Sequence, residues 1–204
     1  MVGMPNWCHN KLTIKGAPAL VAECVAQVAH PEQDDESVAG EAEAMRLAAQ
    51  TAVNQPLDFE QIAPMPEELS REDAVDTARA EELRRRYGAA DWYEWALANW
   101  GTKWNADFDG VFPAIAAGEE AELPRGRQPI IEPGSAFYAF ETAWSPPVPV
   151  ITTLAKRYPG LEIELVWGEP GAAVAARLRW REGELISDEE LALDVALTPE
   201  EMWF

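Results

Sequence analysis

The sequence lacks most of the short motifs that mark an enzyme. It has no glycine-rich phosphate loop, no dinucleotide-binding fingerprint, no nucleophile elbow and no zinc-protease motif. Its two histidines, His9 and His30, stand at no metal-ligand spacing. Cys8 beside His9 on a strand would point to the opposite face. We therefore expect neither a metal nor a cofactor, and the residue pattern disfavours an enzyme.

Long apolar runs are also missing. No stretch of 18 apolar residues occurs, and the first ten residues, "MVGMPNWCHN", have no basic start followed by an apolar segment. These features predict a soluble, cytoplasmic protein that makes no contact with a membrane. The chain has only two cysteines, Cys8 and Cys24, which we expect to be buried thiols on a strand and a helix rather than a disulfide.

Basic residues are scarce: 16 Lys and Arg stand against 36 Asp and Glu, so the formal net charge is −20. Residues 31–82 hold 15 acids and 3 arginines, and residues 182–204 hold 8 acids and no base, so these two segments carry the whole excess. Such a field opposes direct binding of nucleic acid, whose phosphates need Lys and Arg. It favours a basic partner protein. The alternative is an acidic surface that is only solvated.

Tryptophan, in contrast, is abundant, with nine in 204 residues and four between Trp92 and Trp104. "DWYEWALANWG" predicts a short helix capped by Asp91 and ended by Gly101. Apolar and polar residues then alternate over residues 102–108, which predicts a strand with Trp104 facing the core and Lys103 pointing away. We interpret the tryptophans mainly as core residues, and a binding surface remains the alternative.

The first two thirds of the chain predict further elements of mixed clarity. "CHNKLTIKG" alternates like a half-buried strand that ends at Gly16, and the apolar spacing from Pro18 to Pro31 predicts a helix. Residues 57–61 alternate as a short strand. Residues 73–87 read as a helix whose arginines lie in its last turn. Residues 112–135 predict a long loop.

The last third shows the clearest pattern. "AFYAFETAW" predicts a strand, and "SPPVPVITTLAKRY" predicts a helix capped by Ser145. Residues 161–167 and 174–180 alternate on either side of "GEPG", which predicts a hairpin. Glutamates of its first strand should face arginines of its second.

The order of these elements predicts an α+β protein of the ferredoxin-like class, an antiparallel sheet with helices on one face and with helical and loop insertions. We expect one domain, residues 1–204, with insertions near 32–56 and 112–135 and an acidic C-terminal segment, 182–204. The insertions, with the tryptophan segment, should lie against or beside the other sheet face.

Three blocks, "MPNWCHNKLTIKG", "NWGTKWNA" and "FETAWSPPVPVITTLAKRYPGLEIELVWGEPG", occur in an order that resembles the YubB ferredoxin-like family, also called Api-like proteins. Phages, plasmids and integrated elements encode members of this family. The resemblance implies a ferredoxin-like fold and a mobile-element origin, and it implies no activity. The acidic stretch 32–52 and the Pro/Gly-rich loop depart from the family pattern.

Three functions stay open. The protein is predicted first to bind a basic host factor, such as a defence complex, as an inhibitor or nucleic-acid mimic. The second alternative is a nucleic-acid-binding module with an aromatic sheet face. The third is an enzyme with a polar site around Lys103 and Glu141. The candidate binding residues are Trp100, Lys103, Trp104, Asn105, Glu141 and Trp144.

Overall fold

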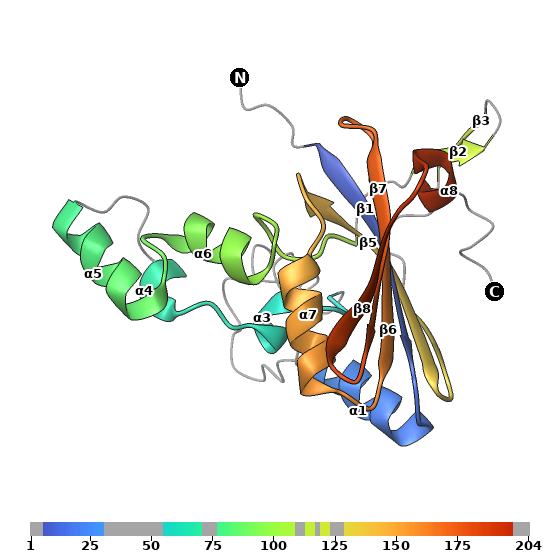
Figure 1. Ribbon diagram of the computed structural model, residues 1–204, viewed down its shortest axis with the longest axis horizontal. Coiled ribbons are helices and arrows are strands. Elements are labelled where there is room, and N and C mark those ends of the chain that lie inside the picture. The colour runs from blue at the N-terminus through green and yellow to red at the C-terminus, as the bar shows by residue number, and fades with distance from the viewer. Residues whose placement is uncertain are drawn as a thin grey trace, which may run out of the picture.

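The computed structural model describes residues 6–30, 55–70, 77–108, 113–116, 119–122 and 129–197. Its centre is a six-stranded sheet in which every neighbouring pair of strands is antiparallel (Figure 1). In spatial order the strands are β4 (Ile130–Glu132), β5 (Ser135–Ala143), β1 (Trp7–Lys15), β6 (Glu162–Glu169), β7 (Val174–Arg181) and β8 (Glu184–Glu190).

Two interleaved strand–helix–strand units make up the core of this sheet. Helix α1 (Pro18–Val28) follows β1, and α7 (Val148–Arg157) connects β5 to β6 while β1 lies between them. Strands β4, β5, β1 and β6 with the two helices form the ferredoxin-like arrangement, and the β7–β8 hairpin extends it at one edge. The predicted fold class is therefore confirmed.

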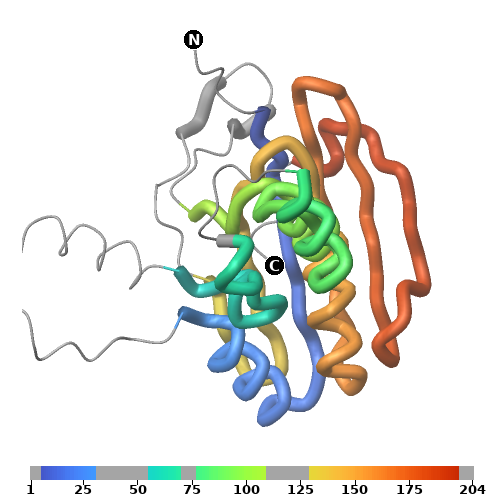
Figure 2. Tube along the Cα trace, turned by 90° about the vertical axis from the view of Figure 1, so that its left-hand side faces the viewer, coloured from blue at the N-terminus to red at the C-terminus, as the bar shows by residue number. Residues whose placement is uncertain are grey.

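The helices are distributed unevenly over the two faces of the sheet. Helices α1 and α7 cover one face, which Figure 2 shows from the helix side. The five-residue helix α8 (Leu193–Leu197) lies against the other face, where Ala196 packs with Val166 and Ala175. The expectation that helices cover only one face is thus wrong for α8, because a C-terminal segment read as acidic also carries apolar residues at helical spacing.

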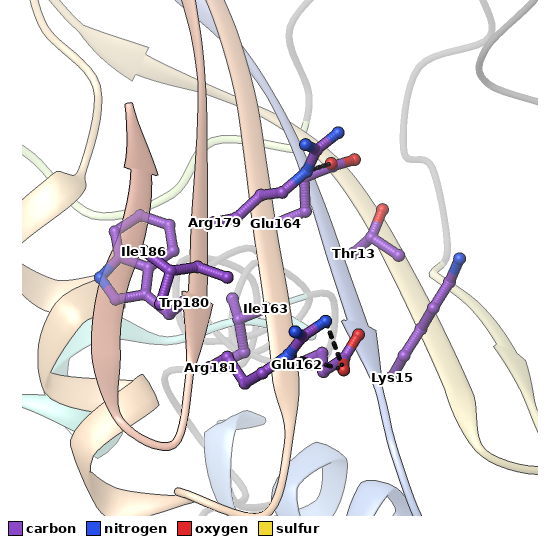
Figure 3. A pocket seen from close by; sticks show the side chains of 9 residues that line it. All are labelled: Thr13, Lys15, Glu162, Ile163, Glu164, Arg179, Trp180, Arg181 and Ile186. Atoms are coloured by element: carbon purple, nitrogen blue, oxygen red, sulfur yellow. Dashed lines mark hydrogen bonds and ion pairs between the residues drawn. The ribbon is translucent and has the colours of Figure 1, made fainter. Parts of the chain in front are cut away.

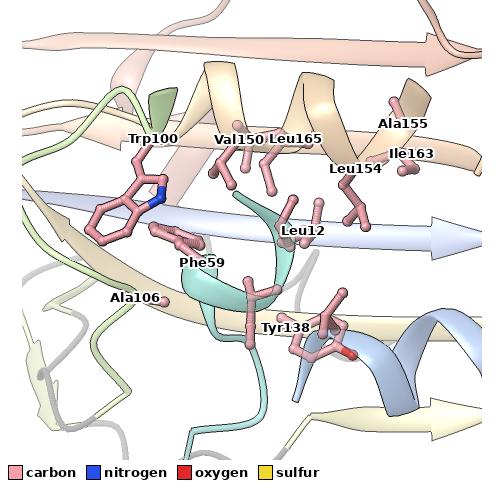
Figure 4. Packing of buried hydrophobic residues seen from close by; sticks show 14 of the residues in the cluster. Leu12, Phe59, Trp100, Ala106, Tyr138, Val150, Leu154, Ala155, Ile163 and Leu165 are labelled. Carbon is pink, nitrogen blue, oxygen red and sulfur yellow. The ribbon is translucent and has the colours of Figure 1, made fainter. Parts of the chain in front are cut away.

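The main core lies between the sheet and helices α1 and α7 (Figure 4). Alternation along β1 directs Leu12 and Ile14 into this core, as predicted from the sequence. Cys8 and Cys24 are buried free thiols, which confirms their predicted state. Burial raises the pKa of Cys24 to about 12, so this thiol stays protonated at neutral pH.

The helices between α1 and β4 add further elements to the helix side of the molecule, whereas the paired strands β2 (Pro113–Ala116) and β3 (Glu119–Glu122) lie beside α8 on the opposite side (Figure 1). Phe59, Trp95 and Trp100 belong to the main core, and Phe59 meets the ring of Phe140 on β5 at 6.2 Å. The expectation that the tryptophan segment lies at the other face is therefore wrong. The helices between α1 and β4 are α3 (Phe59–Ile62), α4 (Glu67–Ser70), α5 (Thr77–Tyr87) and α6 (Trp92–Asn99).

Other predictions for the inserted segments need correction. Residues 57–61 are no strand, because the Asp58 carboxylate accepts a hydrogen bond from the backbone N–H of Glu60 and begins α3 instead. The predicted loop 112–135 contains the β2–β3 hairpin and β4. The predicted insertion 32–56 lies outside the described residues except at its end, as does the start of the helix predicted over 73–87.

Candidate functional site

The start of β1, the end of β5 and the loop after α6 meet at one end of the sheet. Thr102 Oγ1 donates to the carbonyl of Ala143 at 2.9 Å, and Ser145 Oγ donates to the carbonyl of Gly101 at 2.6 Å. The backbone N–H of Trp144 donates to the carbonyl of Asn6 at 2.8 Å. These bonds join three segments that each carry a tryptophan.

Helix α6 begins and ends as the sequence predicts. Asp91 caps it by accepting a hydrogen bond from the backbone N–H of Glu94 at 2.8 Å. Gly101 ends it in the left-handed conformation with φ +87°, and a side chain there would collide with Pro149 of α7. The loop that follows is therefore held tightly against α7.

The predicted strand over residues 102–108 does not form. Its backbone bends, and Asp107 alone forms an isolated bridge with Glu141. Trp104 is 41% exposed, and the Lys103 ammonium lies 4.6 Å from its ring centroid. The predictions that Trp104 is core and that Lys103 points away from it are therefore wrong, because the strand alternation that supported both is absent.

The exposed indole of Trp104 belongs to a row of aromatic rings. Lys103 also lies 5.8 Å from the ring of Trp92, which in turn meets Tyr93 at 5.8 Å. On the other side, Trp104 meets the ring of Trp7 at 6.3 Å. We call this row, together with Trp144 on the adjoining segment, the aromatic surface: Trp7, Trp92, Tyr93, Lys103, Trp104 and Trp144.

Trp144 is the most unusual member of the aromatic surface. Its side chain is 52% exposed, and its backbone takes the left-handed conformation with φ +72°. That conformation normally belongs to glycine, since a side chain there costs about 1–2 kcal/mol. The framework of hydrogen bonds around Asn6, Ala143 and Ser145 holds it in place. The chain therefore presents an indole where a glycine would be relaxed.

Three of the predicted site residues have structural contacts. Trp100 is 6% exposed and donates its indole N–H to the carbonyl of Ala63 at 2.8 Å, so it is a core residue. Asn105 accepts the backbone N–H of Phe59 and donates to Asp58 at 2.7 Å, which ties its loop to α3. Glu141 is buried and its carboxylate lies 2.9 Å from Nδ1 of His9. The structure therefore separates Glu141 from the exposed part of the predicted site.

Asp58 organises the base of this region. Burial opposes ionisation of its carboxyl, but hydrogen bonds from His30, Asn105 and the backbone N–H of Glu60 outweigh burial and lower its pKa. His30 Nδ1 lies 2.8 Å from the carboxylate. Nothing in the local sequence pattern indicates this cluster, because its members come from three separate segments.

The open sheet face carries a pocket of about 130 Å³ (Figure 3). Charged side chains line it, and they pair across the strands as predicted: Arg179 with Glu164 at 2.7 Å and Arg181 with Glu162 at 2.9 Å. Each arginine of the lining pairs with a glutamate, so Lys15 alone gives the pocket a net charge, of +1. Exposed ion pairs of this kind contribute little free energy. Within the described ranges, no group of three His, Cys, Asp or Glu side chains is placed to hold a metal.

Strand β8 forms an acidic edge of the same sheet. Six of its seven residues are exposed, including Glu184, Asp188, Glu189 and Glu190. Among the strands that the structure describes, only β7 pairs with it. Charged residues of this kind keep an edge strand from pairing with other sheets.

The fold and this surface define an α+β protein with a ferredoxin-like domain, an acidic sheet edge and exposed tryptophans at one end of the sheet. Residues 120–201 match a family model described as the ferredoxin-like domain in Api92-like protein. This match confirms the Api-like, ferredoxin-like part of the expected resemblance for that region. The YubB assignment and a mobile-element origin stay predictions.

One solved structure is similar over most of the chain. It is the crystal structure of a protein, Api92, from Yersinia pseudotuberculosis, with 13% sequence identity and a TM-score of 0.46. The similarity covers 93% of this chain and 99% of that one. Comparison with curated proteins finds no match. No helix in the described part of the chain has the length and apolar character needed to cross a membrane.

Proposed function

We propose that this protein is a binding module for a basic partner protein and that the aromatic surface is its contact site. The observation that carries the proposal is the pair of half-exposed tryptophans, Trp104 and Trp144, held on a hydrogen-bonded framework in a chain of net charge −20. Tryptophan and arginine are the residues most enriched among those that dominate protein interfaces.

Two physical properties support this reading. Exposed indole rings gain free energy when a partner covers them, and they attract cationic groups over their faces. The left-handed backbone of Trp144 is strained, and such strain is typical of positions that serve function rather than stability. A surface built only for solubility would have no need of either feature.

The net charge supports the choice of a basic partner. The acidic segments 31–82 and 182–204 attract a positively charged protein from a distance and raise its rate of association. The acidic edge strand β8 contributes to this field. In this proposal the protein acts as an inhibitor or nucleic-acid mimic that is encoded by a mobile element and that occupies a basic groove of a host factor, such as a defence complex.

A contact with nucleic acid is the second alternative, because bases also stack on exposed tryptophans. The net charge of −20 opposes it. An enzyme around Lys103 and Glu141 has less support, since the carboxylate of Glu141 faces His9 while the ammonium of Lys103 faces two indole rings. We therefore favour the protein partner.

The test uses a dye-labelled arginine-rich peptide as the probe and fluorescence anisotropy as the readout, at low and at high salt. Trp104→Ala and Trp144→Gly remove the two exposed indoles, and Ile131→Ala serves as the matched control because Ile131 is 50% exposed on β4. We expect salt-sensitive binding that each tryptophan variant weakens at least threefold and the control leaves unchanged.

Equal binding by all variants would show that net charge alone attracts the peptide, and the aromatic surface would then have no part in it. Tighter binding of a single-stranded RNA oligonucleotide than of the peptide would favour the nucleic-acid alternative. Circular dichroism of each variant establishes that the fold is kept.

A further inference from the structure

We infer that Trp92 and Trp104 form a cation-binding box which Lys103 fills from within, and that its external ligand is the guanidinium group of an arginine in the basic partner. The inference rests on the proposed function and names the partner side chain. Both ring centroids lie within about 6 Å of the Lys103 ammonium, at 5.8 and 4.6 Å, which is the range of a cation–π contact.

The contacts of Lys103 show why it can leave this box. Its ammonium group has no ion pair with a carboxylate within the ranges that the structure describes. Its side chain is only half-buried, so it can swing into water without breaking a salt bridge. The contact it gives up is weak, as exposed cation–π contacts are.

An arginine is the better occupant of the same space. Its guanidinium group is planar, is less strongly hydrated than an ammonium group and stacks on aromatic faces. The ring centroids of Trp104 and Trp7 lie 6.3 Å apart. A partner chain that inserts an arginine between Trp92 and Trp104 therefore also contacts the ring of Trp7. The acidic charge of the protein favours the approach of such a chain.

The test changes the internal competitor and leaves the box in place. Lys103→Met empties the box of its cation, and Lys103→Arg fills it with a guanidinium group at unchanged net charge. With the arginine-rich peptide as probe, we expect Lys103→Met to bind about two- to fivefold tighter and Lys103→Arg about twofold weaker than the native protein.

The matched control is Lys156→Met, because Lys156 is an exposed lysine in the last turn of α7 and its loss makes the same change in net charge. If Lys103→Met binds no tighter than Lys156→Met, the gain comes from net charge and the inference is overturned. Replacing Trp92 by Ala should reduce the difference between Lys103→Met and Lys103→Arg to the net-charge effect that Lys156→Met shows. A larger difference that survives this change would also overturn the inference.

A direct readout follows the indole N–H signals of Trp92 and Trp104 by NMR, assigned with Trp→Phe variants, during titration with arginine amide or with lysine amide. Larger shifts of both signals with arginine amide, greatest in Lys103→Met, are expected. Equal shifts with the two amides contradict a guanidinium site. A different result would overturn the proposed function itself: unchanged peptide binding by Trp104→Ala and by Trp144→Gly.

Discussion

The left-handed backbone at Trp144 leads to an unusual ranking of substitutions by stability. Trp144→Ala and Trp144→Gly both lose the half-buried indole, which costs about 2–3 kcal/mol at about 25 cal/mol per Å². Alanine keeps the strain of φ +72°, worth about 1–2 kcal/mol, whereas glycine releases it. Glycine also lowers the free energy of unfolding by about 0.5–1 kcal/mol relative to alanine, because it makes the unfolded chain more flexible.

The glycine variant should therefore be more stable than the alanine variant by about 0.5–1 kcal/mol, which corresponds to a Tm difference of about 1–4 °C. Denaturant unfolding followed by circular dichroism measures the difference. At Ile131, an exposed strand position, the same pair of substitutions should rank in the opposite order. If alanine is equal to or better than glycine at both positions, Trp144 is not strained and the reasoning is refuted.

Three further predictions concern stability. Trp100→Ala should cost about 3–5 kcal/mol in urea unfolding because its indole is buried, while Trp104→Ala should cost about 2–3 kcal/mol, as at Trp144; the reverse order would contradict the assignment of core and surface. The lowered pKa of Asp58 means that its ionised form stabilises the fold above the unfolded pKa of about 3.9, so this stabilisation should disappear as pH falls through the lower folded pKa. Urea midpoints of the native protein and of Asp58→Asn should accordingly converge at acid pH, and a constant gap would count against the pKa shift. Deletion of residues 33–50 should leave the circular dichroism spectrum of the sheet and helices unchanged, and its collapse would show that these residues belong to the core.

The framework of the fold could be predicted because its elements have long and regular apolar patterns. The elements of this framework each span eight or more residues, long enough to tell the helical spacing of apolar residues from the strand alternation. They are β1, α1, α7 and both strands of the β6–β7 hairpin. Helix α3 has only four residues, and over so short a run the sequence "LDFEQ" fits either period. The hydrogen bond by which Asp58 caps the segment is what makes it a helix rather than a strand.

The aromatic surface could be predicted only in part. Trp104 and Trp144 were candidates from the sequence, but the alternation over residues 102–108 has another origin than a strand. Thr102 is buried where its hydroxyl donates to the carbonyl of Ala143. Ala106 packs in the main core while its carbonyl accepts a hydrogen bond from Gln55. These partners are distant in sequence, so the local pattern could not separate a bent loop from a strand.

Ser145 illustrates the same limit. The sequence suggests a helix cap, yet its hydroxyl donates to Gly101 and the helix begins at Val148 without a side-chain cap. Trp7 and Trp92, which complete the aromatic surface, were missed because they meet Trp104 and Lys103 only in three dimensions. The only signal for them in the sequence was the large number of tryptophans in the chain.

The position of β1 at the centre of the sheet has a consequence for synthesis of the chain. Both of its edges pair with strands that the ribosome makes much later, as Asn10 with Phe140 and with Trp167 illustrates. The backbone N–H and C=O groups on both edges of β1 thus have no strand partner until more than half of the polypeptide has been synthesised after it. Nascent or truncated chains that end before β6 expose an apolar strand to self-association, and the late steps of translation govern the yield of folded protein.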